Sequence, residues 1–402
     1  SDISFSNGKK VISLCYDKSM KTIVIGGGPA GMMASCVRCE FSKVLLFEKN
    51  KELGKKLLLT GHGRCNVTND CDTASFIKKV NSNGRFLTSS LNQFNSQDFI
   101  SFLHDMKVDT TLEDNHRVFP ASQKAETILN AFKQKLSEKN IELHLNEEVL
   151  SLIIEDSVCK GIRTKDTVYY ADCIILCTGG MSYPSTGSSG SGYELAKQAH
   201  HTIVECKPAL CALNISQNWV KECMGITVKN VELKQNKLKV KGDLLFTHFG
   251  ISGPMILNYS SQILRGSIHL DFLPQYIFEQ LDELFRNEWN HTKQIQNALT
   301  DLPLKVWSKF LEQCSIPKTV QACQISKNQR RKLVEACKNQ IVTVTGPRSF
   351  NEAMVTKGGI LTKEINPKTM ESRICKNLKF AGEIIDVDAQ SGGYNLQIAW
   401  TT

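Results

Sequence analysis

Long apolar runs and a leader segment are both missing from this sequence. No stretch approaches the length that spans a bilayer, and the first twenty residues lack the apolar core and small-residue cleavage site of a signal peptide. Internal repeats and low-complexity tracts are absent as well. A chain of 402 residues that is 41% hydrophobic and 22% charged is typical of a globular protein with more than one domain or a large insertion. We therefore expect a cytoplasmic protein without a membrane partner.

Paired cysteine motifs of the zinc-binding kind are also missing. The fifteen cysteines are odd in number, scattered and embedded in apolar runs such as "ADCIILCTGG". Cys36-x-x-Cys39 has the spacing of a redox motif, but it falls within a predicted helix and has no second pair. We expect reduced core cysteines and no metal site.

A concentrated basic stripe is the third feature that the sequence lacks. The net charge is +9, yet the lysines are spread along the whole chain without interleaved aromatic residues. A solvated surface explains this pattern better than nucleic-acid binding, although positive charge also suits an anionic substrate. We expect a small-molecule substrate and no nucleic acid. The sequence leaves open whether the protein is a monomer or a homodimer.

What is present begins with "KTIVIGGGPAGMMAS" at residues 21–35. The pattern predicts a buried strand over 22–25, a helix over 30–40 and a second strand over 43–47. Between the first strand and the helix, three glycines form G-x-G-x-x-G. This order of strand, glycine turn, helix and strand predicts a βαβ unit that binds a dinucleotide.

Each glycine in this turn has its own physical role. Gly26 permits the tight turn, Gly28 lets the backbone approach a pyrophosphate, and Gly31 lets the helix pack on the strand. The phosphate would lie at the helix N-terminus, where unpaired N–H groups and the helix dipole stabilise negative charge. Glu48 follows twenty residues after Gly28, where a carboxylate can accept hydrogen bonds from an adenosine ribose.

Further elements follow along the chain. The patterns predict helices over 95–105 and 122–139, a strand over 141–145 and a three-stranded meander within 147–172. From about residue 201 to 345, alternating strands give way to helices, which predicts an inserted domain of strands and helices.

Two stretches identify the dinucleotide. Residues 168–180, "VYYADCIILCTGG", predict a pair of strands, and residues 377–397, "NLKFAGEIIDVDAQSGGYNLQ", predict a strand followed by a glycine-led helix. Both resemble signatures of the glutathione-reductase-like FAD superfamily, in the same order along the chain. The resemblance implies an α/β fold in which one discontinuous, three-layer Rossmann-like domain holds a single FAD. A second G-x-G-x-x-G for a stable nicotinamide-nucleotide domain is missing.

Six ordered blocks narrow the resemblance to one family. They are "GKKLLLTGHGRCNVTN" (54–69), "HRVFPASQKA" (116–125), "GGMSYPSTGSSGSGYELA" (179–196), "GDLLFTHFGISGPMILNYS" (242–260), "TGPRSFNEAMVTKGGI" (345–360) and "FAGEIIDVDAQSGGYNLQIAW" (380–400). Together they are similar to the BaiN / aminoacetone-oxidase-like (YhiN-type) family of bacterial FAD-binding flavoproteins, from Met20 almost to the end. Activities in that family are an amine oxidase and an enone-type reductase, so the resemblance implies the cofactor and fold better than the substrate.

The glycine pattern and the resemblance together assign a set of FAD contacts. The set consists of Gly26, Gly28, Pro29, Ala30, Gly31, Glu48, Lys49, Arg64, Cys65, Asn66, Val149, Thr178, Gly179, Gly180, Gly382, Glu383, Gly392, Gly393, Tyr394 and Asn395. The resemblance implies that Glu383 or Asp386 holds the ribityl hydroxyls, although superfamily relatives usually place an Asp where Glu383 stands. The helix after Gly393 would direct its N-terminus at the flavin and favour the anionic reduced form.

The two ends of the chain carry separate expectations. The last helix stops at Thr402, only a few residues after it starts, so we expect either tertiary contacts that hold it or a longer native chain. Met20 resembles a natural start, and residues 1–19 are expected to be an extension outside the fold.

Three residues are candidates for catalysis. Arg64 and Cys65 stand in a glycine-rich loop expected beside the flavin, where Arg64 would supply charge. Cys65 would either pack in the core or act as a redox thiol, and packing is favoured because no resolving cysteine is evident. His248, in the inserted domain, is a candidate proton donor, with a structural role as its alternative.

Other features keep two interpretations each. Arg117 and Arg348 would bind an anionic substrate or phosphate, or pair with surface acids. The alternating glycines at 187–192 would form a second phosphate cradle for NAD(P)H, or line the flavin or a hinge, and the second interpretation is favoured because a preceding strand is missing.

We predict four segments and one main function. The segments are an extension (1–19), the first part of the FAD-binding domain (20–200), an inserted substrate or cap domain (201–345) and the C-terminal part of the FAD-binding domain (346–402). The function is an FAD-dependent oxidoreductase acting on a small organic substrate, with NAD(P)H as a transient donor or dioxygen as acceptor. The alternatives are a flavin-dependent tRNA-modifying enzyme and a flavin redox sensor with Cys65 as its switch.

Overall fold

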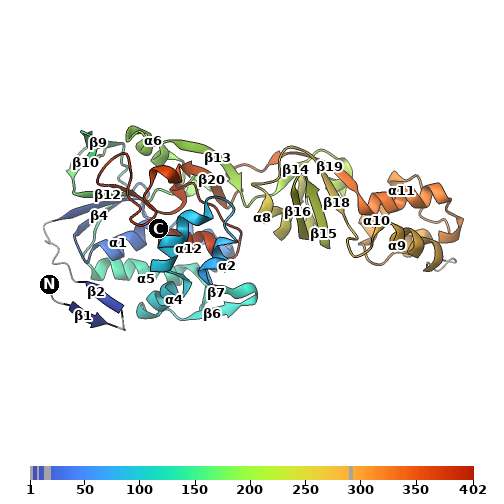
Figure 1. The fold of residues 1–402 in the computed structure, drawn as a ribbon, viewed down its shortest axis with the longest axis horizontal. Helices are drawn as coiled ribbons and strands as arrows, with labels where there is room; N and C mark the ends of the chain where they lie inside the picture. Colours follow the sequence, from blue (N-terminus) through green and yellow to red (C-terminus); the bar gives the residue numbers. More distant parts are fainter. Residues whose placement is uncertain (1–2, 7–8, 13–19, 289–292) are drawn as a thin grey trace. The chain divides into compact units, whose positions relative to one another are not determined.

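The computed structural model describes residues 3–6, 9–12, 20–288 and 293–402, which form two compact units (Figure 1). Unit 1 comprises residues 1–207 and 355–402, and unit 2 comprises residues 208–354. Unit 2 begins seven residues after the expected start of the insertion at 201 and ends nine residues after its expected end at 345. Of the expected extension over 1–19, strands β1 and β2 are described, and the rest of it lies outside the described residues.

The strands of unit 1 are β1 (Ile3–Ser6), β2 (Lys9–Ile12), β3 (Lys21–Ile25), β4 (Lys43–Glu48), β5 (Thr68–Asn69), β6 (Thr110–Glu113), β7 (Arg117–Pro120), β8 (Glu142–Leu145), β9 (Ser151–Glu155), β10 (Val158–Arg163), β11 (Val168–Tyr170), β12 (Cys173–Leu176), β13 (Ile203–Ala209), β20 (Val355–Ile360) and β21 (Leu378–Phe380). Its α-helices are α1 (Pro29–Arg38), α2 (Thr73–Ile77), α3 (Thr88–Gln93), α4 (Ser96–Asp105), α5 (Ala125–Glu138), α6 (Ser191–Gln198) and α12 (Tyr394–Thr401). Short 3₁₀ turns cover Leu57–Gly63, Gly84–Leu87, Asp114–His116, Pro184–Thr186, Thr362–Glu364 and Gly382–Ile384.

A five-stranded parallel sheet in the order β21-β12-β3-β4-β8 forms the centre of unit 1. Strands β3 and β4 pair in parallel, with Ile23 opposite Leu45, and α1 connects them. The predicted βαβ unit is confirmed, with element bounds within two residues of those expected.

Both faces of this sheet are covered. Side chains alternate along a strand, so neighbouring residues of β3 enter different cores. Val24 packs in the cluster that contains Met32 of α1 and Phe132 of α5, whereas Ile23 packs in the cluster that contains Ile162 of the meander. The meander is an antiparallel sheet in the order β11-β10-β9. The predicted three-layer Rossmann-like fold is confirmed.

Both strands expected within residues 168–180 form, but they belong to different sheets. Strand β11 belongs to the meander and β12 to the parallel sheet. The hydrogen-bond partner changes between them, because the Ala171 N–H donates to the carbonyl of Lys160 in β10 (3.0 Å) and the Asp172 N–H donates to the carbonyl of Lys21 in β3 (2.9 Å).

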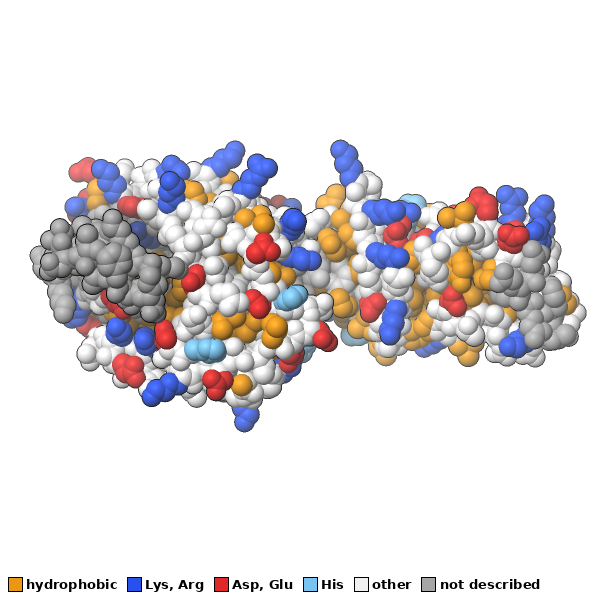
Figure 2. All heavy atoms as spheres, turned by 60° about the horizontal axis from the view of Figure 1, so that its bottom comes forward, with side chains coloured by type: hydrophobic (Ala, Val, Ile, Leu, Met, Phe, Trp, Pro, Cys, Tyr) orange, Lys and Arg blue, Asp and Glu red, His pale blue; other side chains and the backbone are white. Residues whose placement is uncertain are grey.

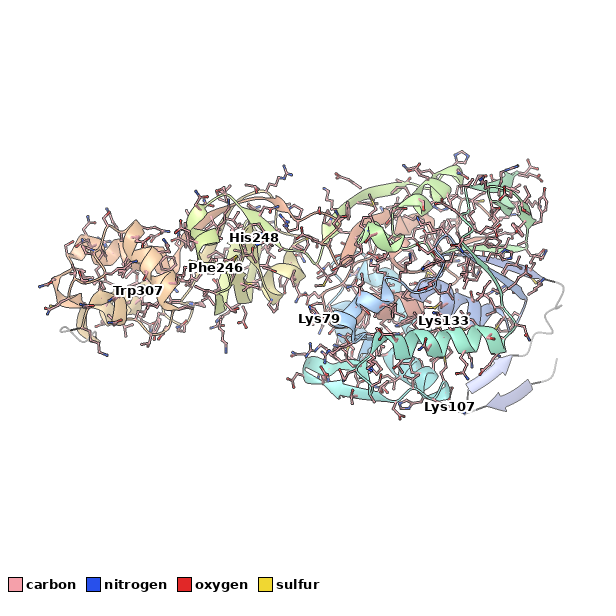
Figure 3. The ribbon with its side chains drawn as sticks, turned by 180° about the vertical axis from the view of Figure 1, so that it is seen from behind. Lys79, Lys107, Lys133, Phe246, His248 and Trp307 are labelled. Carbon is pink, nitrogen blue, oxygen red and sulfur yellow. The ribbon has the colours of Figure 1, made fainter. Side chains whose placement is uncertain are left out.

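Unit 2 combines a closed barrel with helices. The barrel runs β14-β17-β16-β15-β18-β19, with strands β14 (Leu213–Ile215), β15 (Thr227–Gln235), β16 (Leu238–Phe246), β17 (Gly250–Ser252), β18 (Gly266–Asp271) and β19 (Gln340–Pro347). Its α-helices are α7 (Asn218–Glu222), α8 (Pro254–Tyr259), α9 (Phe278–Glu283), α10 (Leu304–Gln313) and α11 (Lys327–Lys338), and shorter helical turns cover Leu284–Glu288, Ile295–Asn297 and Ala322–Gln324. Phe246 and Trp307, both fully buried, lie in one cluster whose members all belong to residues 213–344 (Figure 3). The predicted combination of strands and helices in the insertion is confirmed.

The chain passes between the units at two places that lie close together. Strand β13 ends at Ala209 and β20 begins at Val355, and these two strands form one two-stranded sheet. The insertion therefore begins and ends in paired strands of a single ribbon.

Candidate functional site

The glycine turn after β3 shows why two of its three glycines are required by the fold. Gly26 has a φ of +106°, and a Cβ atom there would lie 2.5 Å from the carbonyl oxygen of Cys177. A Cβ atom at Gly31 would lie 1.8 Å from the carbonyl oxygen of Gly26. The turn conformation and the close packing of α1 on the loop therefore exclude side chains at both positions.

Gly28 is different, because nothing in the protein requires a glycine there. Its φ of −80° and ψ of −174° are open to any residue, and a Cβ atom would meet no atom within 4 Å. Gly28 caps α1, whose first turn contains no acidic residue and receives no side-chain cap. The first N–H groups of a helix have no partner within the helix and attract anions. A bare, N–H-rich cradle of this kind fits the diphosphate of FAD.

Glu48 closes the same site from the end of β4. Its carboxylate accepts hydrogen bonds from the N–H of Gly27 at 2.7 Å and from the backbone and side chain of Asn50 at 2.8 and 2.6 Å. Lys49 donates to the hydroxyl of Ser189 at 2.8 Å, and Val149 is buried in the core beside the meander. The expected ribose ligand Glu48 thus also fixes the glycine turn.

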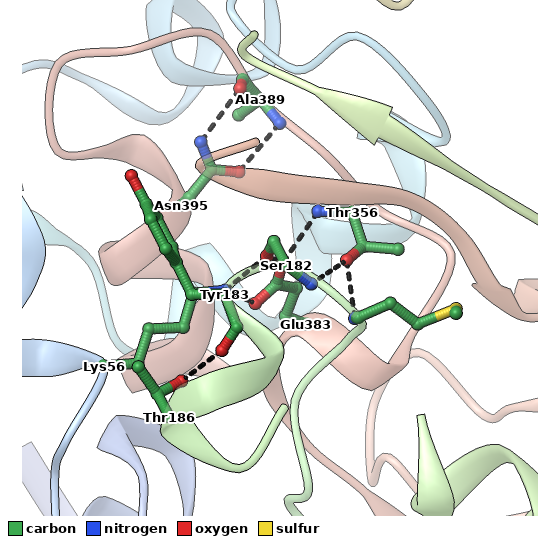
Figure 4. Close-up of polar contacts among 9 residues, drawn as sticks. Lys56, Ser182, Tyr183, Thr186, Thr356, Glu383, Ala389 and Asn395 are labelled. Atoms are coloured by element: carbon green, nitrogen blue, oxygen red, sulfur yellow. Dashed lines mark hydrogen bonds and ion pairs between the residues drawn. The ribbon is translucent and has the colours of Figure 1, made fainter. Parts of the chain in front are cut away.

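A second polar cluster surrounds Glu383 (Figure 4). Lys56 donates to one carboxylate oxygen of Glu383 at 2.6 Å and to Ser182 at 2.6 Å. The other oxygen accepts from the hydroxyl of Ser182 at 2.9 Å and the N–H of Thr356 at 2.7 Å. Glu383 therefore forms an ion pair with Lys56, and three segments that are far apart in sequence hold its carboxylate in place.

Sequence reasoning missed Lys56, Ser182 and Thr356, although all three stand in the blocks that carry the family resemblance. The glycine-rich segment at Thr178, Gly179 and Gly180 precedes this cluster. A Cβ atom at Gly180 would lie 2.4 Å from the hydroxyl oxygen of Thr356, which explains the glycine by close packing.

Loop 64–69 is bonded to the start of α12. The side-chain amide of Asn66 is oriented so that both its oxygen and its nitrogen have hydrogen-bond partners. The oxygen accepts from the N–H of Gly393 at 3.0 Å, and the nitrogen donates to the carbonyl of Thr68. Gly393 has a φ of +97°, and a Cβ atom there would lie 2.3 Å from the Thr68 carbonyl oxygen. Asn69 donates to the carbonyl of Gly392 at 3.1 Å. The expected flavin-facing segments from the two ends of unit 1 are thus in contact.

The remaining expected contacts at the C-terminal end have structural partners. Asn395 accepts from the N–H of Ala389 at 3.0 Å and donates to its carbonyl at 2.9 Å, which closes the loop before α12 (Figure 4). The N–H of Gly382 donates to the hydroxyl of Thr402 at 2.7 Å. Asp386 accepts from Asn83 at 2.9 Å, and its pKa is raised by burial.

Arg64 has partners within the chain, and Cys65 lies in the core, which is the role favoured for it from the sequence. The guanidinium of Arg64 donates to Glu113 and Gln123, each at 2.9 Å, and lies 4.2 Å from the ring centre of Phe119. Cys65 is fully buried, and burial raises the pKa of its thiol to about 12. Arg64 is therefore engaged within the chain, and the thiol of Cys65 stays protonated, which argues against a redox switch.

The thiols of Cys36 and Cys39, like that of Cys65, have pKa values raised by burial. Burial raises the pKa of Cys36 to about 12, and the Cys39 thiol donates to the carbonyl of Cys36 at 2.9 Å. All fourteen cysteines that the structure describes are free. These surroundings favour the expected role as core residues.

His248 and Arg348 belong to unit 2. His248 is exposed in the turn between β16 and β17 and lies in edge-to-face contact with Phe249 at 4.8 Å (Figure 3). Arg348 pairs with Glu352 at 2.5 Å and lies 4.3 Å from the ring centre of Phe249. In unit 1, Arg117 donates to the carbonyl of Asp114 at 3.0 Å. Arg117 and Arg348 thus bond to an acid or a carbonyl of the chain itself, which favours a structural role over binding of an anionic substrate.

A cavity of about 700 Å³ opens beside the start of α12. It is lined by Asn69, Asp70, Cys71, Asp72, Thr73, Ser75, Lys79, Asn95, Gln97, Asn115, His116 and Tyr394. Amide and carboxylate side chains predominate, and Tyr394 and His116 supply the rings. Burial raises the pKa of Cys71 to about 11 and that of Tyr394 to about 12, so both keep their protons at neutral pH.

The described residues contain neither a metal-site cluster nor a membrane-spanning helix. No cluster of three or more His, Cys, Asp or Glu side chains among them has the arrangement of a metal site. None of their helices has the length and apolar character needed to cross a membrane.

The chain is similar over nearly its whole length to one protein family and to two characterised enzymes. The family described as "HI0933-like protein Rossmann domain" matches residues 20–402. The chain is 30% identical over 398 residues to 3-dehydro-bile acid delta(4,6)-reductase from Clostridium scindens, covering 94% of this chain and 96% of the relative. It is 28% identical over 387 residues to ribosomal RNA dihydrouridine synthase from Escherichia coli, covering 94% and 95%.

A solved structure supports the fold alone. The 3-ketosteroid-delta4-(5alpha)-dehydrogenase from Rhodococcus jostii RHA1, in complex with 4-androstene-3,17-dione, superposes with a TM-score of 0.53 at 13% identity. The superposition covers 97% of this chain and 96% of that one.

Proposed function

Because the chain belongs to the HI0933-like family of FAD-binding oxidoreductases, we propose that it reduces a carbon–carbon double bond conjugated to a carbonyl group. The names of the two relatives support this class, since a 3-dehydro-bile acid with Δ4,6 bonds and a uridine ring both contain such a bond. FAD, when bound, supplies the hydride for this chemistry.

The observation that carries the proposal is the unfilled space at Gly28. Backbone conformation and packing both permit a side chain there, so the reason for the glycine lies outside the chain. The N-terminus of α1 would hold the diphosphate, and Glu48 would accept from the ribose. In the second cluster, Lys56 and Thr356 hold the carboxylate of Glu383 in place for the ribityl chain.

Proton transfer to the substrate requires an acid near the reacting carbon. Cys71 and Tyr394 line the cavity beside α12 and hold their protons at Sγ and Oη, so either can serve as that acid. His248 remains the candidate from unit 2. Replacing each in turn, with Cys71→Ala, Tyr394→Phe and His248→Gln, should lower kcat at unchanged FAD content only where the proton donor is removed.

The test is an anaerobic titration of the purified yellow protein. NADH or NADPH should bleach the flavin absorbance, and a 3-oxo-Δ4 steroid or a uridine-containing RNA should restore it. Flavin that neither nucleotide bleaches, but that an amine substrate reduces, would contradict a reductase and indicate an amine-type oxidase that discharges to dioxygen.

A second, more specific candidate is reduction of uridine within RNA. The cavity favours it, because its amide and charged side chains can hydrogen-bond an imide ring, whereas a steroid offers them few polar atoms. Faster turnover of the RNA than of the steroid would support this candidate, and the reverse order would exclude it.

A further inference from the structure

Five lysines stand on the hairpin formed by β15 and β16 in unit 2. They are Lys229, Lys234, Lys237, Lys239 and Lys241, and all are exposed. The buried residues of β15 alternate with them and enter the barrel core, as Val231 and Leu233 do. Lys229, Lys234, Lys239 and Lys241 therefore share the outer face, and Lys237 lies in the turn between the strands. Figure 2 shows Lys and Arg side chains, with acidic ones among them, on the surface of unit 2.

Strand register brings these charges close together. Lys234 lies opposite Lys239, and Glu232 lies opposite Lys241. Like charges placed directly opposite each other on one sheet face are unfavourable. Glu232 offsets part of this repulsion, because it forms ion pairs with Lys234 at 2.9 Å and Lys239 at 3.4 Å.

Three of the five cations remain unbalanced. Within the described residues, Lys229, Lys237 and Lys241 have no ion-pair partner, and Asp243 at the end of this face accepts the N–H of Asn230. Alternate residues along a strand are about 6.7 Å apart, so Lys239 and Lys241 extend as a row. The sequence count showed scattered lysines, whereas the hairpin places five of them on one surface.

We propose that this lysine face of β15 and β16 binds the phosphate backbone of RNA. The proposal rests on the second candidate function above, in which RNA carries the reacting base. Lysine is a point-charge phosphate ligand that requires no fixed geometry, and the hairpin exposes no aromatic residue that would stack on bases, since its Phe246 is buried. The face therefore positions RNA without reading its sequence.

The experiment measures binding without turnover. The FAD-loaded protein is titrated against a labelled single-stranded RNA of mixed sequence over a series of salt concentrations. In the variant Lys229→Gln, Lys237→Gln and Lys241→Gln, the slope of log K against log salt should become less steep by about 2 to 3, with affinity at low salt reduced about tenfold or more. Lys234 and Lys239 stay in place, so the pairing with Glu232 is retained.

The matched control removes the same charge from unit 1. The three control residues are exposed: Lys107 and Lys133, which Figure 3 labels, and Lys165. Their replacement by Gln should leave affinity and slope unchanged. An unchanged slope in the hairpin variant would overturn the proposal, as would equal affinity for polyglutamate or phosphatidylserine vesicles. The hairpin variant should reduce a small conjugated carbonyl substrate at the normal rate. Loss of this reaction would count against the proposed reductase function, whereas an unchanged salt dependence of RNA binding would count against the lysine face alone.

Discussion

At the scale of single residues, the glycine turn separates a requirement of the fold from a requirement of the ligand. We predict that Gly28→Ala weakens FAD binding on the order of 10- to 100-fold, because a methyl group would occupy the diphosphate cradle. The melting temperature of the apoprotein should fall by no more than about 2 °C, since Gly28 makes no side-chain cap that Ala would lose and its backbone conformation and surroundings admit a methyl group. Fluorescence titration with FAD and thermal melts measure the two effects.

Gly26→Ala is the control for that prediction. Its φ of +106° and the 2.5 Å approach to Cys177 mean that the apoprotein itself should be destabilised by several kcal/mol, on the order of 3. Equal stability losses in both variants would show that Gly28 serves the fold and not the cofactor.

Thiol reactivity is a second prediction at this scale. Because Cys65 is fully buried and its pKa is raised to about 12, iodoacetamide should not modify it in the native protein at pH 8. Cys323 is exposed and should react readily. Mass-spectrometric mapping distinguishes them, and rapid alkylation of native Cys65 would restore the redox-switch hypothesis.

At the scale of elements, α12 shows how eight residues remain helical at the end of the chain. The indole N–H of Trp400 donates to the carbonyl of Val67 at 3.0 Å, and its ring stacks on Phe99 at 4.7 Å and Phe132 at 5.3 Å. We predict that Trp400→Ala costs about 3 to 5 kcal/mol in the free energy of unfolding and reduces FAD retention. Trp400→Phe should cost about 1 kcal/mol, because it loses mainly the hydrogen bond; denaturant melts compare the two.

The junction between α6 and β13 gives a pH dependence. His201 is buried between Glu364 (3.1 Å) and Ser372 (2.7 Å), and burial lowers its pKa below the usual 6.5. The unfolded chain then binds more protons than the native one as pH falls, so stability should decrease from about pH 7 towards pH 5. His201→Gln should flatten this part of the stability profile, and a profile as steep as that of the unmodified protein would contradict the assignment.

The same scale shows what could be predicted from the sequence. The βαβ unit, α5 and the meander follow local periodicity, so their existence was predictable. The partners of Arg64 were not, because Glu113 lies 49 residues away on a hairpin whose packing leaves no local pattern. Lys56 and Thr356 were missed for the same reason, because their contacts with Glu383 join residues distant in sequence and form only in the folded chain.

At the scale of the whole molecule, each unit has its own hydrophobic core. Every member of the unit 2 cluster lies within residues 213–344. We predict that the fragment 208–354 folds alone and melts cooperatively, without binding FAD. Unit 1 with residues 207 and 355 joined by a short glycine-serine linker should remain yellow. Circular dichroism and flavin absorbance test both statements, and an unfolded fragment would show that the barrel needs the rest of the chain.

The β13 and β20 ribbon has a consequence for how such proteins diversify. An insertion that starts and finishes in adjacent strands imposes almost no constraint on its own length or architecture, because closing the loop costs the host little entropy. The FAD-binding unit can thus stay constant while the inserted unit varies, so relatives with unlike substrates can share one flavin-binding fold.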